Sequence, residues 1–325
     1  MHVLVIGSGL IGTATAWYLR QEGADVTVVD RACGPARETS FANAGMLTPS
    51  MADPWNAPGV VWKLLGWVGR EDAPMLLRPR DIPRLAGWGT RFLWNSRAAS
   101  FERNMLRNVA LASFSLDSLR ELRAELGLSY CERTRGVLKV FRDPANLATA
   151  VAVAQQLGEH GVVHRALDRE GVADVEPSLA PVAEKLAGGI LHPDDESGDA
   201  HRFVCALAEA ARAAGVRFEF DTAVTGLRAK GGRLAAVETT AGELSADACV
   251  LAAGSYSAPL LAGLGLRLPV RPVKGYSITV PFGDENLAPR RPVTDDHLHI
   301  AVTPFGDRLR VAGTAEFTGL DHSVG

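Results

Sequence analysis

The chain opens on the stretch Val3-Leu4-Val5-Ile6-Gly7-Ser8-Gly9-Leu10-Ile11-Gly12, in which four apolar residues run directly into a glycine pattern. The apolar run predicts a buried parallel strand, and Gly-x-Gly-x-x-Gly after a strand is typical of a turn that holds a dinucleotide. Gly7 allows the tight turn, Gly9 lets the backbone approach a pyrophosphate, and Gly12 lets the next helix pack on the strand. The positive end of that helix would then face the phosphates.

The residues after the glycines complete this nucleotide-binding pattern. They predict a helix from Ile11 to Gln21, ended by Gly23, and a second strand over residues 26–29. Asp30 follows at nearly the spacing expected of the carboxylate that accepts hydrogen bonds from ribose hydroxyls. The adjacent Arg31 would suit a 2′-phosphate, but the negative charge of Asp30 would repel one.

The composition of the chain is that of an ordinary globular protein. Its 325 residues exceed what one hydrophobic core usually spans, so we expect two domains. With 34 basic and 37 acidic residues the net charge is -3, which provides no attraction to nucleic acid, and no such partner is expected. The cysteines are far apart in sequence and predict free thiols in a reducing compartment. They are Cys33, Cys131, Cys205 and Cys249.

Two features predict a cytoplasmic protein. The first strand begins at residue 3, which leaves no room for a secretory leader. No apolar stretch reaches the roughly 20 residues that a membrane-spanning helix needs.

Residues 55–94 leave open a peripheral attachment to the inner face of the bacterial inner membrane. They contain five of the six tryptophans, mixed with leucines and basic residues. A short helix carrying Trp62, Lys63 and Trp67 would suit a segment that lies in a membrane interface. The alternative is a lid packed over an active site.

The nucleotide-binding pattern returns late in the chain. Residues 216–220 predict a strand, residues 223–240 a hairpin, and residues 248–252 a buried strand that runs into Ala253-Gly254. We therefore predict an α/β protein with a discontinuous Rossmann-type domain. That domain comprises residues 1–50 and 196–258.

A second domain is predicted from residues 51–195 and 259–325, with a mixed, mainly antiparallel α+β fold. Three antiparallel strands are expected at residues 276–280, 299–303 and 308–312. Asp143-Pro144 predicts a helix start, because aspartate is a good N-cap and proline suits the first helical position.

The long insertion between the two nucleotide-binding segments favours FAD over NAD, since NAD dehydrogenases usually complete their sheet without such a break. The loop from Glu38 to Gly45 fits a flavin, because small side chains let the backbone pass close to a flat ring. The same residue types also favour plain turns for local reasons. The predicted FAD-binding residues are Val5, Ile6, Gly7, Ser8, Gly9, Leu10, Ile11, Gly12, Asp30, Arg31, Ser40, Ala42, Asn43, Ala44, Gly45, Val224, Ala253 and Gly254.

Several short stretches, taken together and in order along the chain, resemble the bacterial D-amino acid dehydrogenases, which are flavoproteins of the D-amino acid oxidase fold. The stretches are Val3–Gly12, Glu38–Gly45, Pro54–Gly59, Asp194–Asp199, Gly254–Ser257 and Pro272–Ser277. The resemblance implies non-covalently bound FAD and oxidative deamination of D-amino acids, such as D-alanine, to 2-oxo acids and ammonia. It also implies hydride transfer to FAD and passage of electrons to a respiratory acceptor, a quinone, rather than to oxygen.

Members of that family continue beyond the position of this chain's last residues, with an Arg-Pro motif and a glycine-rich stretch that covers the flavin. We therefore expect a C-terminally truncated chain. Two other interpretations stay open. One is a related glycine, sarcosine or opine oxidoreductase, and the other is a non-catalytic nucleotide-binding remnant.

A bound amino acid needs a cation or a hydroxyl for its carboxylate, and a bidentate arginine would fit best. Lys274 and Tyr276 stand at the start of a strand that should face the flavin, so we predict them as the catalytic residues. The alternative is a solvated lysine beside a tyrosine packed at a sheet edge.

Two acidic clusters superficially suggest metal sites. His297 and His299 alternate beside Asp295 and Asp296, so that the histidines would share one face of a strand. An exposed strand end explains them better, and a polar loop explains Asp194-Asp195-Glu196. We expect no metal.

Overall fold

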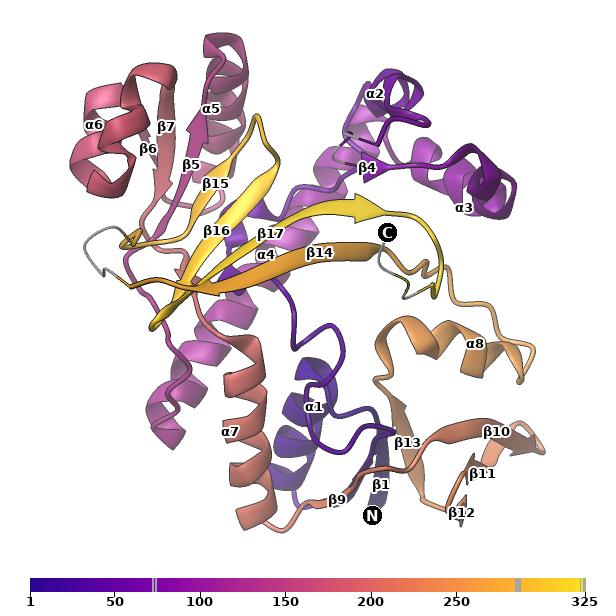
Figure 1. The fold of residues 1–325 in the computed structure, drawn as a ribbon. Helices are drawn as coiled ribbons and strands as arrows, with labels where there is room; N and C mark the ends of the chain where they lie inside the picture. Colours follow the sequence, from indigo (N-terminus) through magenta and orange to yellow (C-terminus); the bar gives the residue numbers. More distant parts are fainter. Residues whose placement is uncertain (72, 74, 284–287, 322, 324–325) are drawn as a thin grey trace. The chain divides into compact units, whose positions relative to one another are not determined.

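The structure is a computed structural model that describes residues 1–71, 73, 75–283, 288–321 and 323 (Figure 1). The chain divides into two compact units. The first unit comprises residues 1–43, 126–130 and 200–272, and the second comprises residues 44–125, 131–199 and 273–325.

The first unit is built on a parallel sheet in the order β13-β1-β2-β9. Its strands are β1 (His2–Ile6), β2 (Asp25–Val29), β9 (Arg217–Glu219) and β13 (Ala248–Leu251). The late strand β13 pairs directly with β1, from Val3 opposite Ala248 to Ile6 opposite Leu251. The sheet that begins at residue 2 is therefore completed by a strand more than two hundred residues later.

Both faces of this sheet are covered, which explains why its central strands β1 and β2 are mostly apolar and buried. Helices α1 (Leu10–Gln21) and α7 (Ala200–Ala213) pack together on one side, as Figure 1 shows. On the other side, Leu4 and Ile6 pack in one cluster with Val237 of the hairpin β10 (Val224–Lys230) and β11 (Arg233–Thr239), next to β12 (Gly242–Leu244). After β13 the chain continues into η4 (Gly254–Tyr256) and α8 (Ser257–Ala262). The predicted Rossmann-type fold is confirmed.

The second unit is built on a mixed sheet in the order β14-β17-β16-β15-β5-β7-β6, with β4 beside β17. Its pairs are antiparallel except β15 with β5 and β4 with β17. This confirms a mixed, mainly antiparallel sheet. The strands are β4 (Met75–Leu76), β5 (Val137–Phe141), β6 (Arg165–Leu167), β7 (Gly188–His192), β14 (Lys274–Pro281), β15 (Val293–Asp295), β16 (Ile300–Phe305) and β17 (Arg308–Glu316).

Helices cover this sheet near β5. Leu138 of β5 packs in a cluster with Val172 of α6, and Phe141 packs in another with Ala154 of α5. The Asp143 side chain accepts hydrogen bonds from the first turn of α5, which confirms the predicted N-cap. The helices of the unit are η1 (Pro49–Met51), α2 (Val60–Trp67), η2 (Pro79–Asp81), α3 (Ile82–Trp94), α4 (Ala98–Leu126), α5 (Pro144–Gly158), α6 (Arg169–Val175) and η3 (Pro177–Lys185).

A β-bulge interrupts the pairing of β14 with β17. Gly275 lies opposite Ala315, but the next residue, Tyr276, lies opposite Gly313, so Thr314 is the extra residue. Thr314 has a φ of 52°, an uncommon conformation for a β-branched side chain. Because neighbouring strand residues alternate between faces, the bulge moves Glu316 onto the face that carries Tyr276.

The two units differ from the predicted domain limits at residues 44–50, 126–130, 196–199 and 259–272, and residues 126–130 lie in the first unit. Residues 44–50 and 196–199 lie in the second unit, because β3 (Met46–Leu47) pairs with β8 (Glu196–Ser197). Residues 259–272 lie in the first unit. The assignment of the two units to cofactor and substrate stays a prediction.

Among the residues that the structure describes, no helix is both long enough and apolar enough to cross a bilayer.

Candidate functional site

The turn between β1 and α1 is packed so closely that side chains are excluded from two of its glycines. Gly7 has a φ of 104°, and a Cβ there would lie 2.6 Å from the carbonyl oxygen of Ala252. A Cβ at Gly12 would overlap the carbonyl oxygen of Gly7. The structure therefore brings the predicted glycine turn against the end of β13, just before Ala253 and Gly254.

The N-terminus of α1 has the properties of a phosphate site. Its N-cap, Gly9, makes no side-chain capping hydrogen bond. Ser40 approaches from the following loop, and its hydroxyl accepts a hydrogen bond of 3.1 Å from the Leu10 N–H. Helix N-termini attract anions through their N–H groups and dipole. The residues present therefore fit the pyrophosphate of FAD, and Gly9, Leu10 and Ser40 would hold it.

Asp30 is fixed beside this turn. Its carboxylate accepts hydrogen bonds of 2.7 Å from both the N–H and the hydroxyl of buried Ser8, and one of 2.9 Å from the Ala32 N–H. A carboxylate offers about four acceptor positions, so these described bonds leave capacity for a ribose hydroxyl. The ribose contact itself stays a prediction.

Arg31 is engaged within the first unit. Its guanidinium is hydrogen-bonded to the Glu38 carboxylate and lies over the Tyr256 ring, 3.9 Å from the ring centroid. This arrangement holds the arginine against the protein rather than presenting it to a 2′-phosphate.

The end of the predicted flavin loop is anchored in the second unit. The Thr303 hydroxyl donates to the Ala44 carbonyl at 2.7 Å, and the Gly198 N–H donates to the Gly45 carbonyl at 2.8 Å. Gly45 has a φ of 65°, and a Cβ there would overlap the Phe305 ring.

Three other predicted FAD-binding residues lie in the first unit. The Asn43 amide donates long hydrogen bonds back to the carbonyls of Thr39 and Ser40, which closes a local turn. Ala42 belongs to that turn, and Val224 begins β10 and packs against the cluster that contains Leu4 and Ile6. Their contacts with FAD stay predictions.

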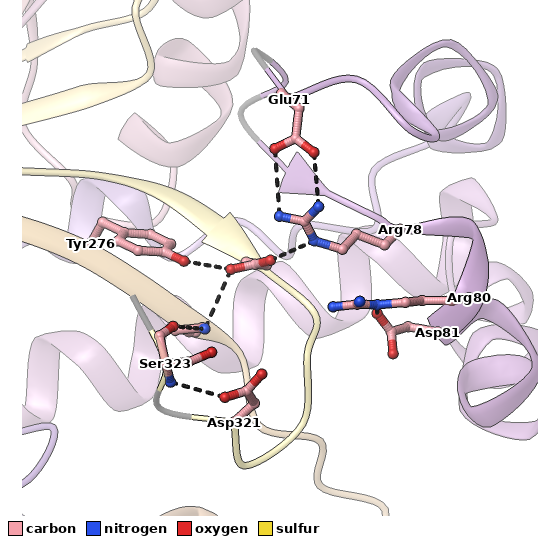
Figure 2. A network of polar contacts seen from close by, with 9 residues as sticks. Glu71, Arg78, Arg80, Asp81, Tyr276, Asp321 and Ser323 are labelled. Atoms are coloured by element: carbon pink, nitrogen blue, oxygen red, sulfur yellow. Dashed lines mark hydrogen bonds and ion pairs between the residues drawn. The ribbon is translucent and has the colours of Figure 1, made fainter. Parts of the chain in front are cut away.

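Lys274 and Tyr276 are brought together on one face of β14, where both meet Glu316. Tyr276 and Arg78 are labelled in Figure 2. The Tyr276 hydroxyl donates to the Glu316 carboxylate, and the Lys274 Nζ lies 3.5 Å from it. The hydrogen bond to Glu316 raises the pKa of Tyr276, so this phenol stays protonated. The same bond from Tyr276, together with Arg78, lowers the pKa of Glu316. The catalytic role of Lys274 and Tyr276 stays a prediction.

Sequence reasoning missed Glu316 and Arg78. The alternation of β17 places Glu316 on the wrong face unless the bulge at Thr314 is known. Gly313, inside β17, is the signal that could have indicated it. Arg78 is one of several basic residues in the tryptophan-rich stretch, and only the pairing of β4 with β17 brings it to Glu316.

The acidic clusters are accounted for by partners within the protein. Glu196 forms ion pairs with Arg120 at 2.7 Å and Arg123 at 2.6 Å. Asp195 accepts a hydrogen bond from the Ser50 hydroxyl. Burial raises the pKa of the Asp195 carboxyl to about 7.

At the other cluster, Asp295 pairs with Arg142 at 2.7 Å and Asp296 with Lys139 at 3.2 Å. Within the described part of the chain, no group of three or more His, Cys, Asp or Glu side chains is arranged to hold a metal ion. His322, the nearest further histidine in sequence, lies outside the described residues.

The Rossmann sheet and its glycine turn define a dinucleotide-binding protein. The chain belongs to the FAD dependent oxidoreductase family, whose model matches residues 2–324. It is 47% identical over 324 residues to the D-amino acid dehydrogenase of Bradyrhizobium diazoefficiens, covering 100% of the chain and 77% of that relative. It is 45% identical to the D-amino acid dehydrogenase of Vibrio cholerae serotype O1, with the same coverage. The resemblance and the predicted cofactor, FAD, are confirmed.

Solved structures agree on the fold. Glycine oxidase from Geobacillus kaustophilus superposes with a TM-score of 0.72 at 24% identity, covering 99% of this chain and 73% of that one. L-proline dehydrogenase from P. horikoshii gives a TM-score of 0.75 at 16% identity, covering 100% and 73%. At such identities the likeness establishes the fold alone.

We expect Gly12→Ala to abolish FAD binding. The added methyl group would overlap the Gly7 carbonyl, so α1 must move away from the turn that faces the phosphates. Gly89→Ala, inside α3, is the matched control because a Cβ there meets open space. The flavin-to-protein absorbance ratio after purification, with circular dichroism to check folding, measures the effect. A folded Gly12→Ala protein with normal flavin content would contradict this assignment.

We expect the free energy of unfolding to fall as the pH rises from about 4 to 7, in part because of Asp195. Its raised pKa means that the folded state binds the proton more tightly than the unfolded state, so the stability gained at low pH is lost as Asp195 ionises near pH 7. The effect is at most about 4 kcal/mol. Urea unfolding at several pH values should show a flatter profile for Asp195→Asn. The profile of Asp53→Asn, at an exposed position, should match that of the wild type.

Proposed function

We propose that this protein oxidatively deaminates D-amino acids to 2-oxo acids and ammonia. The observation that carries the proposal is the identity of 45–47% to D-amino acid dehydrogenases along the entire chain. The glycine turn that excludes side chains at Gly7 and Gly12 supports it, because this turn fits the cofactor of that family. The substrate is an amino acid, and an electron acceptor is required.

The reaction removes two electrons and two protons from the substrate. The amine loses a proton, Cα loses a hydride, and water hydrolyses the resulting imino acid to the 2-oxo acid and ammonia. The chemistry that FAD supplies when bound is acceptance of that hydride. The protein's part is to orient the substrate, and we assign this task to Lys274 and Tyr276.

Two properties of these side chains suit the task. The Tyr276 hydroxyl donates its single proton to Glu316, so its oxygen is left to accept a hydrogen bond from the substrate amine. The Lys274 ammonium provides a positive charge on the same strand face. Both are held by one buried carboxylate, so their positions are set before a substrate arrives.

The decisive experiment is anaerobic titration of the purified flavoprotein. We expect D-alanine to bleach the flavin absorbance and L-alanine to leave it unchanged. Tyr276→Phe should lower kcat/KM for D-alanine by roughly tenfold, the effect of losing one well-placed hydrogen bond. Tyr18→Phe, on an exposed face of α1, should have no effect.

Other outcomes of this titration would contradict the proposal. Bleaching by glycine or sarcosine but not by D-alanine would indicate a related amine oxidoreductase. A colourless protein that does not take up added FAD would indicate a nucleotide-binding remnant without activity.

We further propose that the electrons pass to a membrane quinone and that the protein attaches peripherally to the inner face of the inner membrane. The relatives are named dehydrogenases, which supports an acceptor other than oxygen. Trp62 and Leu65 of α2 support the attachment, because their side chains are 76% and 63% exposed beside Lys63. Aromatic and basic residues on an exposed helix favour an anionic interface.

Co-sedimentation with anionic phospholipid vesicles tests this attachment. We expect the double variant Trp62→Ser, Leu65→Ser to lose most of its binding, because it removes the exposed apolar surface of α2. Leu111→Ser, Phe114→Ser removes equally exposed apolar side chains from α4 and is the matched control. Equal sedimentation of the wild type and both variants would rule out α2 as the attachment surface.

A further inference from the structure

The Arg78 guanidinium is bound on one edge by a buried carboxylate, that of Glu316. The short strand β4 pairs with the end of β17, so that Leu76 lies opposite Glu316. Arg78 follows two residues later, and its Nε donates to Glu316 at 2.9 Å. The Glu316 side chain is only 4% exposed, whereas that of Arg78 is 31% exposed. One edge of the guanidinium is thus fixed inside the protein, and the rest of the group reaches the surface.

The outer edge of the same guanidinium is occupied by a carboxylate of the protein itself. Nη1 and Nη2 of Arg78 donate to the two carboxylate oxygens of Glu71, at 2.8 and 3.4 Å. Figure 2 shows Glu71 facing Arg78 in this two-pronged arrangement. It is the geometry with which arginine recognises any carboxylate. Because the Glu71 side chain is 72% exposed, its ion pair with Arg78 is weak and easily exchanged.

Glu316 also contacts the two residues that were predicted to bind the substrate. Lys274 and Tyr276 contact the same carboxylate that holds Arg78. Three side chains therefore converge on one buried acceptor. Tyr276 gives its single proton to Glu316 and Lys274 donates to the Ser323 carbonyl at 2.8 Å, so among the three only Arg78 presents a pair of parallel N–H donors.

We infer that Arg78 binds the α-carboxylate of the substrate, and that Glu71 accepts hydrogen bonds from Nη1 and Nη2 of Arg78 until the substrate carboxylate displaces it. This inference rests on the proposed function, because it names the carboxylate ligand of that amino acid substrate. Glu316 is a positioning residue in this arrangement, since it acts by fixing Arg78, Lys274 and Tyr276. The ligand class is a small α-amino or unsubstituted carboxylate.

The test compares Glu71→Gln, Arg78→Lys and Arg80→Lys in the holoenzyme. Arg80→Lys is the matched control, because Arg80 is a nearby exposed arginine that pairs with Asp81 rather than with Glu316. Steady-state dye reduction gives kcat and KM for D-alanine. Ligand-observed NMR gives the dissociation constant of propionate, which carries the carboxylate but cannot be deaminated.

We expect Glu71→Gln to lower both KM and the propionate dissociation constant by about two- to five-fold with kcat unchanged, because a competing exposed ion pair is removed. Arg78→Lys should raise both by roughly tenfold or more, since lysine cannot bind bidentately. Arg80→Lys should change neither.

The two readouts separate the inference from the proposed function. If D-alanine is oxidised but neither Glu71→Gln nor Arg78→Lys changes KM or propionate binding, the inference is overturned and the function stands. If D-alanine is not oxidised but propionate binding changes as expected, the function fails and the carboxylate site stands. If Arg78→Lys folds poorly, the KM and propionate binding of Glu71→Gln test the inference by themselves, because this variant leaves the Arg78–Glu316 pair intact.

Discussion

The first unit depends on one close approach, that of α1 to the turn after β1. Gly12 lies so near the Gly7 carbonyl that no side chain fits between them, and Gly7 in turn lies against Ala252 at the end of β13. A strand from the start of the chain and a strand from its last third are therefore fixed at one point. The N-terminus of α1 can face a pyrophosphate only because these contacts keep the helix close to the sheet.

The second unit is organised around a different constraint, the burial of a single carboxylate. Leaving Glu316 unpaired in this position would be costly, so its hydrogen bonds to Tyr276 and Arg78 and its approach to Lys274 stabilise the charge. The same contacts fix three donor side chains that come from distant parts of the sequence. Stability and preorganisation of the site thus arise from one set of bonds.

The sequence predicted the first unit well and the second unit only in outline. Gly7 and Asp30 follow a local pattern whose spacing reflects backbone geometry, so the strands beside them could be predicted. The antiparallel strands near Tyr276 were also predicted. The polar site could not be, because Arg78 and Glu316 meet only through the pairing of β4 with β17.

The bulge at Thr314 shows why a sequence pattern alone fails at such a site. Alternation along β17 would place Glu316 on the face of Arg310, away from Tyr276, and one extra residue reverses that assignment. This reversal requires Thr314 to adopt a backbone conformation that is rare for a β-branched residue. A regular strand would avoid this cost but would leave Tyr276 without its acceptor. The strained residue is therefore best understood as part of the polar site, because it is the feature that directs the central carboxylate toward Tyr276 and Lys274.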